Sequence, residues 1–253
     1  MLNLWLRRVA RPAVLASLLL SSGVAMASGL QVSPISLSLQ ARESASGLTL
    51  SNSGDNVVYA QVRVYQWSQD DTGDQLTPSR GLLASPPMIE LKPGENQLIR
   101  IIRAKAPPQG AGAVEDAYRI LVNGLPIKAA IQQSGIQFSL TYSLPVFVQP
   151  LNVVKTSPKL QWSTHLQADG KEVKLRVSNS GNGHAQLAAL SFIDAAGNST
   201  VINPGLLGYV LPGATMNWTL KMPPSALTAG GKFKVMMNGT QTMQDVTLDS
   251  ATR

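Results

Sequence analysis

Residues 48–54 read LTLSNSG, and a closely similar stretch, LRVSNSG, returns at residues 175–181. In each copy, apolar residues alternate with polar ones and then give way to Asn-Ser-Gly, a combination that favours a turn. A Pro-Gly turn follows each copy, at Pro93-Gly94 and at Pro212-Gly213, and leads into another alternating run. The shared order of strand, turn, strand and Pro-Gly turn indicates two tandem copies of one β architecture.

The rest of the chain has the same character. Short segments rich in Val, Ile, Leu and Thr are separated by Gly, Pro, Asn and Asp, and helical periodicity is nearly absent after the first residues. This pattern is typical of an all-β sandwich. The clearest expected strands are 48–51, 59–67, 97–103, 117–122 and 135–148. We expect two sandwich domains, 28–150 and 151–253, with their boundary near Pro150 to Pro158.

A hairpin is expected at residues 69–74, which read QDDTGD. Asp and Gly tolerate the backbone angles of a tight turn. A calcium-binding loop is the alternative interpretation, but the acidic residues miss the D-x-D-x-D-G spacing that such a loop requires.

The first 27 residues have the features of a secretory signal peptide. Three arginines, Arg7, Arg8 and Arg11, precede an apolar stretch at 13–20, and Ala25-Met26-Ala27 follows. Charge, an apolar run and an A-x-A site in this order predict cleavage after Ala27. A membrane anchor is the alternative, but the apolar run is shorter than the roughly 20 residues that a spanning helix needs. We therefore expect an exported protein without stable membrane insertion.

The composition excludes several classes of function. The chain has 21 Lys and Arg against 14 Asp and Glu, and the basic residues are dispersed, which argues against a nucleic-acid partner. There is no cysteine, so disulfides and thiolate chemistry are excluded. The fold must be held by packing alone, although an exported compartment would permit disulfides.

No catalytic centre is recognisable. His165 and His184 are the only histidines, and neither lies in an H-x-x-x-H or H-x-E arrangement, so we expect surface histidines and no zinc ligands. The sequence has no G-x-S-x-G motif to activate a serine and no glycine-rich phosphate loop. We therefore expect neither enzyme activity nor a cofactor or metal ion.

The most informative segment is residues 135–150, GIQFSLTYSLPVFVQP. In an extended strand Ile136, Phe138, Leu140 and Tyr142 share one face, while the alternate positions are polar and uncharged. An ordinary interior strand would have the same periodicity. The run is nevertheless long against the usual range of about 3 to 10 residues, and it ends at the expected domain boundary. An exposed apolar edge invites pairing with another chain, so this strand is a candidate for binding a protein partner.

An ordered set of motifs spans residues 30 to 150. It consists of Trp67, Ser85-Pro86-Pro87, Leu91 to Gly94, Gln97 to Arg100, Tyr118-Arg119-Ile120 and Leu125-Pro126, followed by the alternating strand. This order resembles the first domain of the periplasmic pilus chaperones of the chaperone-usher pathway. The second domain resembles that family mainly in its placement and β character.

The resemblance implies two immunoglobulin-like β-sandwiches in a boomerang arrangement, located in the periplasm. The implied partners are pilus subunits, which lack their last strand, and an outer-membrane usher. The chaperone would complete the subunit's fold with alternating side chains of its own edge strand. By position, Ile136, Phe138 and Leu140 would be the inserted residues, with Tyr142 as a fourth candidate.

The family also implies a basic anchor for the terminal carboxylate of the client. The best-known branch carries a base on the first strand and a lysine near the end of the donor strand, but residues 31–40 and 136–149 contain neither. Pro34 and the run from Tyr142 to Pro145 resemble the divergent, archaic branch. We expect the anchor at Arg119, on a strand next to the donor strand, with Arg103 or Arg100 assisting.

A structural pilus subunit or adhesin built from similar sandwiches is the alternative. Such a subunit would have one incomplete domain and an amino-terminal donor extension, whereas this sequence predicts two complete domains.

Overall fold

The computed structural model describes residues 29–125, 140–167, 172–228, 230–245 and 248–249. The expected signal peptide, residues 1–27, lies outside this part of the chain, as do two of the expected donor residues, Ile136 and Phe138. The prediction of an all-β fold with two immunoglobulin-like sandwiches is confirmed: the described residues form β-strands and one short helix, α2 (Ser225–Thr228).

The first sandwich pairs two sheets. The smaller one has the strand order β1 (Leu30–Ser33), β3 (Ala45–Asn52), β8 (Asn96–Arg103) and β6 (Leu82–Ser85). The larger one has the order β2 (Leu37–Leu39), β10 (Thr141–Val148), β9 (Asp116–Leu125), β4 (Val58–Asp70) and β5 (Gly73–Pro78), with β7 (Met88–Leu91) paired to β4. Alternate residues of both sheets point inward and form one buried apolar core. This core includes Leu50, Val62, Ile99, Ile120 and Val146.

The second sandwich follows the same plan. One sheet has the order β15 (Thr215–Leu220), β12 (Val173–Asn179), β11 (Leu160–Leu166) and β18 (Leu248–Asp249), and the other has β14 (Ser199–Val210), β13 (Ala185–Asp194), β16 (Gly231–Met237) and β17 (Thr240–Asp245). Val177, Leu187 and Phe233 are among its fully buried residues. The stretch between Val148 and Leu160 joins the two sandwiches.

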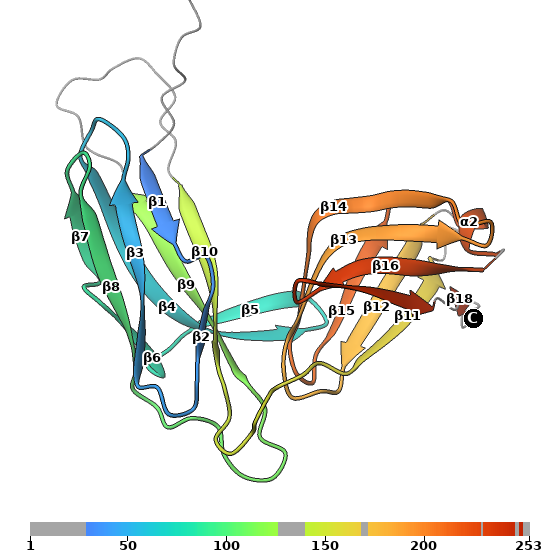
Figure 1. The fold of residues 1–253 in the computed structure, drawn as a ribbon, viewed down its shortest axis with the longest axis horizontal. Coiled ribbons are helices and arrows are strands. Elements are labelled where there is room, and N and C mark those ends of the chain that lie inside the picture. Colours follow the sequence, from blue (N-terminus) through green and yellow to red (C-terminus); the bar gives the residue numbers. More distant parts are fainter. Residues whose placement is uncertain (1–28, 126–139, 168–171, 229, 246–247, 250–253) are drawn as a thin grey trace, which may run out of the picture.

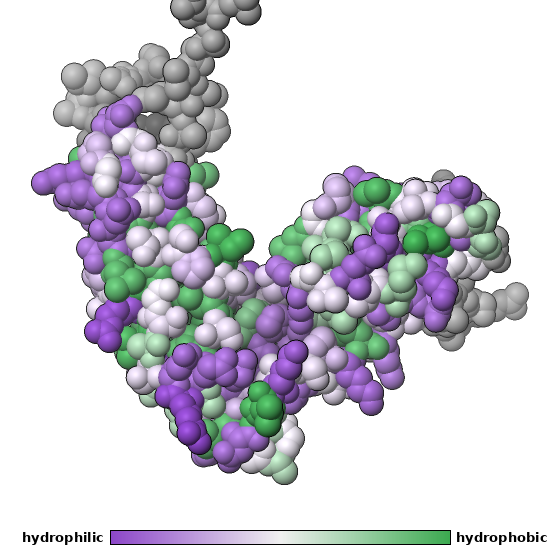
Figure 2. Space-filling view, viewed as in Figure 1, coloured by the Kyte–Doolittle hydropathy of each residue, from purple (hydrophilic) through white to green (hydrophobic). Residues whose placement is uncertain are grey.

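The two sandwiches lie at an angle to one another and form the two arms of a V (Figure 1). The larger sheet of the first sandwich faces the second arm, and its hairpin of β4 and β5 extends to meet that arm. The hairpin expected at residues 69–74 is confirmed, with Asp70 paired to Gly73, whose φ of 117° lies in the region that favours glycine. In the space-filling view, a wide open hollow lies between the two arms (Figure 2).

The Asn-Ser-Gly repeat has a structural meaning. In the first sandwich Asn52 ends β3, and its side chain is buried. Its Nδ2 donates to the carbonyl oxygens of Leu91 and Asn56, and its Oδ1 accepts the N–H of Gly54. The backbone carbonyl of Asn52 accepts the N–H of Gly94, so one residue joins the strand end, its own turn and the Pro-Gly turn.

Asn179 at the end of β12 makes the corresponding bonds in the second sandwich. Its Nδ2 donates to the carbonyl oxygens of Val210 and Gly183, its Oδ1 accepts the N–H of Gly181, and its backbone carbonyl accepts the N–H of Gly213. The repeated sequence therefore marks the same position in each of two similar folds.

Candidate functional site

Strand β10 has an open edge. It pairs along its whole length with β9, whereas β2 covers its second edge only from Val146 to Val148. Over Thr141 to Pro145, no strand of the described residues pairs with that second edge. This half of the strand can therefore accept a strand from another chain.

Two hydrogen bonds show which backbone groups face the open edge. The Leu140 carbonyl accepts the N–H of Gly124 on the β9 side, and the Gln149 N–H donates to Leu39 on the β2 side. Because successive residues of a strand direct their backbone groups to opposite edges, Thr141 and Ser143 direct theirs to the open edge. Pro145 does so as well but has no N–H, so it ends the row of donors where β2 begins.

The apolar face of β10 becomes less buried toward its amino end. Leu144, Val146 and Val148 lie in the core of their own sandwich. Tyr142 is partly buried against that core, and its hydroxyl donates to the Leu30 carbonyl at 2.6 Å. Leu140 is 39% exposed. Of the four expected donor residues, then, Leu140 is accessible and Tyr142 is engaged inside its own domain.

Arg119 lies on β9, directly opposite Pro145 of β10, which confirms that its strand neighbours the expected donor strand. Its side chain is 13% exposed, and its guanidinium carbon lies 3.7 Å from the centroid of the Trp67 ring and 5.2 Å from that of Tyr209. Burial among these groups lowers the pKa of Arg119 from its ordinary value. The guanidinium also donates to the Ser143 carbonyl at 3.4 Å.

The charge of Arg119 has little compensation. In the described part of the chain, Asp74 is the carboxylate that pairs with it, at an N–O distance of 3.8 Å, and the Asp74 side chain is 46% exposed. A guanidinium taken out of water favours a close anionic partner with two parallel hydrogen bonds. Arg119 therefore has capacity left for a carboxylate.

Arg100 and Arg103 do not converge on this place. Both lie on β8, which belongs to the smaller sheet of the sandwich, whereas Arg119 lies on the larger one. Arg100 is exposed, and the Nη1 of Arg103 is buried without a hydrogen-bond partner. The expectation that either assists Arg119 is thus not supported by their positions, because an intact core separates the two sheets.

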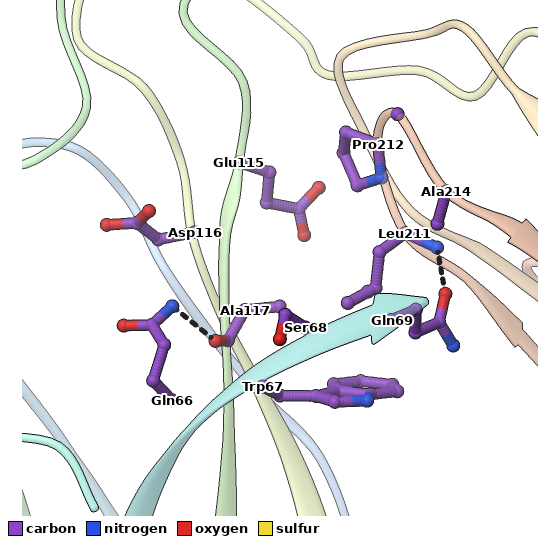
Figure 3. Close-up of a pocket in the computed structure, with 11 residues that line it drawn as sticks. Gln66, Trp67, Ser68, Gln69, Glu115, Asp116, Ala117, Leu211, Pro212 and Ala214 are labelled. Atoms are coloured by element: carbon purple, nitrogen blue, oxygen red, sulfur yellow. Dashed lines mark hydrogen bonds between the residues drawn. The ribbon is translucent and has the colours of Figure 1, made fainter. Parts of the chain in front are cut away.

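The junction of the two sandwiches was not visible in the sequence. Trp67, Ala117 and Phe147 of the first sandwich are buried in one cluster with residues of the second, and Trp67 packs edge-on against Tyr209 with 5.3 Å between the ring centroids. Gln69, near the end of β4, bridges the junction. Its Oε1 accepts the Leu211 N–H (Figure 3), and its Nε2 donates to the Tyr209 carbonyl.

His184 corrects one expectation. It was expected at the surface, but its ring stacks on Phe147 with 3.5 Å between centroids and an interplanar angle of 3°. Its Nδ1 lies 2.7 Å from Oε1 of Glu115, a buried side chain of the first sandwich. Glu115 also lines a cavity of about 280 Å³ at the junction, which Figure 3 shows together with Trp67 and Leu211. These contacts hold the arms of the V together.

Neither a metal centre nor a membrane span is found in the described residues. No group of three His, Cys, Asp or Glu side chains among them could hold a metal ion. None of the helices in this part of the chain has the length and apolar character needed to cross a bilayer.

Comparisons with known proteins identify the class to which this fold and open edge belong. Residues 29–154 match the family described as "Pili and flagellar-assembly chaperone, PapD N-terminal domain". No curated protein matches the chain. The chain belongs to this family of pilus chaperones.

Solved structures of similar shape cover both sandwiches. A chain of the CsuC–CsuE chaperone–tip adhesion subunit pre-assembly complex, from the archaic chaperone-usher Csu pili of Acinetobacter baumannii, is 25% identical with a TM-score of 0.65, and the match covers 87% of this chain and 99% of that one. The E. coli chaperone DraB is 19% identical with a TM-score of 0.57, covering 87% and 98%. A chain of the Salmonella enterica SafA pilin complex with the SafB chaperone is 18% identical with a TM-score of 0.58, covering 87% and 95%.

Proposed function

We propose that this protein is a periplasmic chaperone that binds pilus subunits by donating the edge of β10 to their incomplete fold and delivers them to an outer-membrane usher. The observation that carries the proposal is the open edge from Thr141 to Pro145, which lies beside the under-compensated cation of Arg119. The membership of the chain in a family of pilus chaperones supports the same conclusion. Catalysis has no part in this function.

The side chains of the donor strand provide the affinity. Ile136, Phe138 and Leu140 alternate with polar residues in the sequence just before β10, and we propose that these three apolar side chains enter a groove on the subunit. Burying each such side chain stabilises by about 1.5 to 3 kcal/mol, before the costs of ordering and association. The backbone groups of Thr141 and Ser143 then set the direction and register of the added strand. Tyr142 would enter the groove as a fourth side chain only if the hydrogen bond from its hydroxyl to the Leu30 carbonyl broke.

Arg119 is the proposed anchor for the subunit's terminal carboxylate. Its place on the strand next to β10 brings a positive charge close to the end of the open edge. A carboxylate there would replace the long contact to Asp74 with a short, paired one. The anchor would fix the end of the client chain, and so the position at which its groove meets the donor residues.

The leader sequence and the relatives support the proposed cell compartment and partners. Arginines, an apolar run and an A-x-A site at residues 1–27 support export. Similar structures include a chaperone–tip adhesion subunit complex and a pilin–chaperone complex. A structural subunit or adhesin is the weaker hypothesis, because the family match is to the chaperones.

Exchange of one donor side chain for a charge tests the proposal. Phe138→Asp should weaken recovery of the co-expressed subunit by roughly ten- to a hundredfold, because a carboxylate cannot enter an apolar groove. Recovery is measured by affinity purification from the periplasm with quantification of the bound subunit.

Ser139→Asp is the matched control, since it adds the same charge on the polar side of the strand and should leave recovery unchanged. Thermal unfolding of both variants checks that the chaperone stays folded. Equal recovery with Phe138→Asp and Ser139→Asp would count decisively against strand donation.

A further inference from the structure

Aromatic rings from both sandwiches enclose the guanidinium of Arg119. Trp67 comes from β4 of the first sandwich, and Tyr209 comes from β14 of the second, with Arg119 at 3.7 Å and 5.2 Å from their respective ring centroids. The two rings also pack against each other edge-on. Cations are attracted to the faces of aromatic rings, and the attraction is stronger where water is excluded. One wall of the anchor therefore belongs to the other domain.

The ring of Tyr209 is itself held in place. The residue is 7% exposed, and its hydroxyl accepts a hydrogen bond of 2.8 Å from the Gln186 side chain on the neighbouring strand. Its backbone carbonyl accepts the Gln69 side chain of the first sandwich at 3.0 Å. Tyr209 is thus fixed both within its own sheet and against the first sandwich.

Without this ring, less would hold Arg119 in place. The polar contacts of its guanidinium are long, at 3.8 Å to Asp74 and 3.4 Å to the Ser143 carbonyl. An arginine side chain loses rotamer entropy when it is immobilised, so a side chain already held in place binds a ligand at lower cost. The rings of Trp67 and Tyr209 provide that restraint.

We infer that the carboxylate anchor is a site shared by the two domains, in which Tyr209 is a positioning residue that holds Arg119 ready for the terminal carboxylate of the client. The inference rests on the proposed function and adds a role for the second sandwich. Capture of the client terminus would then depend on the apposition of the two arms, since the ring reaches Arg119 only across their junction.

The test uses the subunit recovered with the wild-type chaperone, prepared with its terminal carboxylate and, by intein cleavage with ammonia, with a terminal amide. Tyr209→Met removes the ring but keeps an apolar side chain of comparable length. It should weaken binding of the carboxylate form by roughly three- to thirtyfold and that of the amide form by less than about twofold. Tyr209→Phe loses the hydroxyl bond to Gln186 but keeps the ring and the backbone bond to Gln69, so it should bind both forms within about twofold of the wild type.

Arg119→Ala separates this inference from the function on which it rests, with Arg100→Ala on the opposite sheet as its control. Weakened carboxylate binding with Arg119→Ala but not with Tyr209→Met leaves the anchor in place and overturns the role of Tyr209. Equal loss of both client forms with Tyr209→Met overturns it too, because that is the result of a merely structural role. If Arg119→Ala binds the carboxylate form normally, Arg119 is not the anchor, and the proposed anchor is overturned together with the role of Tyr209.

A measurement on the unmodified protein covers the case in which Tyr209→Met does not fold. Proton cross-relaxation between the Arg119 side chain and the Tyr209 ring should be observed by NMR in the free wild-type chaperone. Absence of this cross-peak, with the Arg119 to Trp67 cross-peak present, contradicts the inference.

Discussion

At the scale of single residues, Asn52 and Asn179 have more influence on the fold than their size suggests. Each side chain is almost completely buried, and the Asn52 side chain makes three hydrogen bonds to backbone groups while that of Asn179 makes four. An apolar side chain at either position would leave buried carbonyl and amide groups without partners. This explains why the same Asn-Ser-Gly stretch stands in both halves of the sequence.

Asn52→Ala and Asn179→Ala should each lower the free energy of unfolding by about 2 to 4 kcal/mol, since buried backbone groups would lose their partners. Denaturant unfolding followed by circular dichroism measures the effect. Asn56→Ala is the control, because Asn56 is exposed and takes part through its backbone carbonyl. A change below about 0.5 kcal/mol at Asn52 would contradict this account of the repeat.

Arg119 shows which features of a single residue could be predicted from the sequence and which could not. That Arg119 lies on the strand next to the donor strand was predicted from the motif order and is confirmed by the pairing of β9 with β10. Its stacking on Trp67 and Tyr209 was not predicted, because neither ring is near it in sequence. That Arg100 and Arg103 lie on the other sheet was not predicted for a related reason: strand assignment alone does not tell which sheet a strand joins.

At the scale of elements, β10 is one strand with two roles. From Val146 to Val148 it is an interior strand between β9 and β2, and its apolar residues complete the core. From Thr141 to Pro145 it is an edge strand. A single periodic pattern runs through both parts, so the interior and edge interpretations of the sequence were each correct for one half of the described strand.

Ser143→Pro tests the role of the backbone at the open edge. The Ser143 N–H points away from β9, so its removal should leave the β9 ladder intact while it weakens subunit binding by roughly two- to tenfold through one lost hydrogen bond. Binding is measured by titration of the purified chaperone with the recovered subunit.

Ser143→Ala is the control, because it removes the hydroxyl but keeps the N–H. Hydrogen exchange of the β9 amides checks that the sheet is unchanged. Wild-type affinity of Ser143→Pro, with β9 protected as before, would show that no strand adds at this point of the edge.

At the scale of the whole molecule, the junction sets how the two arms stand. Phe147 and His184 stack across it, Glu115 pairs with His184, and Gln69 bonds to the backbone of the second sandwich. Both polar contacts are flanked by the apolar cluster around Trp67. A junction of this kind can keep the donor edge and the anchor in a constant relation.

Glu115→Gln should loosen that junction. The charged partner of His184 would be lost at a buried position, and we expect a decrease in the free energy of unfolding of about 1 to 3 kcal/mol together with a broader range of angles between the arms. Denaturant unfolding measures the first effect and small-angle X-ray scattering the second. Glu90→Gln, on the exposed side of β7, makes the same chemical change and should change neither the free energy of unfolding nor the range of angles between the arms. If Glu115→Gln had the scattering profile and the free energy of unfolding of the wild type, Glu115 would not contribute to the stability of the junction.

From the amino-acid sequence it could be predicted that the chain is all-β, that it holds two copies of one sandwich, and that an alternating apolar strand precedes the junction. These features are local: side chains of a strand alternate between two faces, and turns need particular residues, so both leave a record in neighbouring positions. Three further facts became known from the folded chain: where β2 stops covering β10, which arginine faces the second arm, and that His184 stacks on Phe147. Those facts depend on contacts between residues far apart in the chain, and alternation within a strand carries no information about what lies across a sheet or a domain junction.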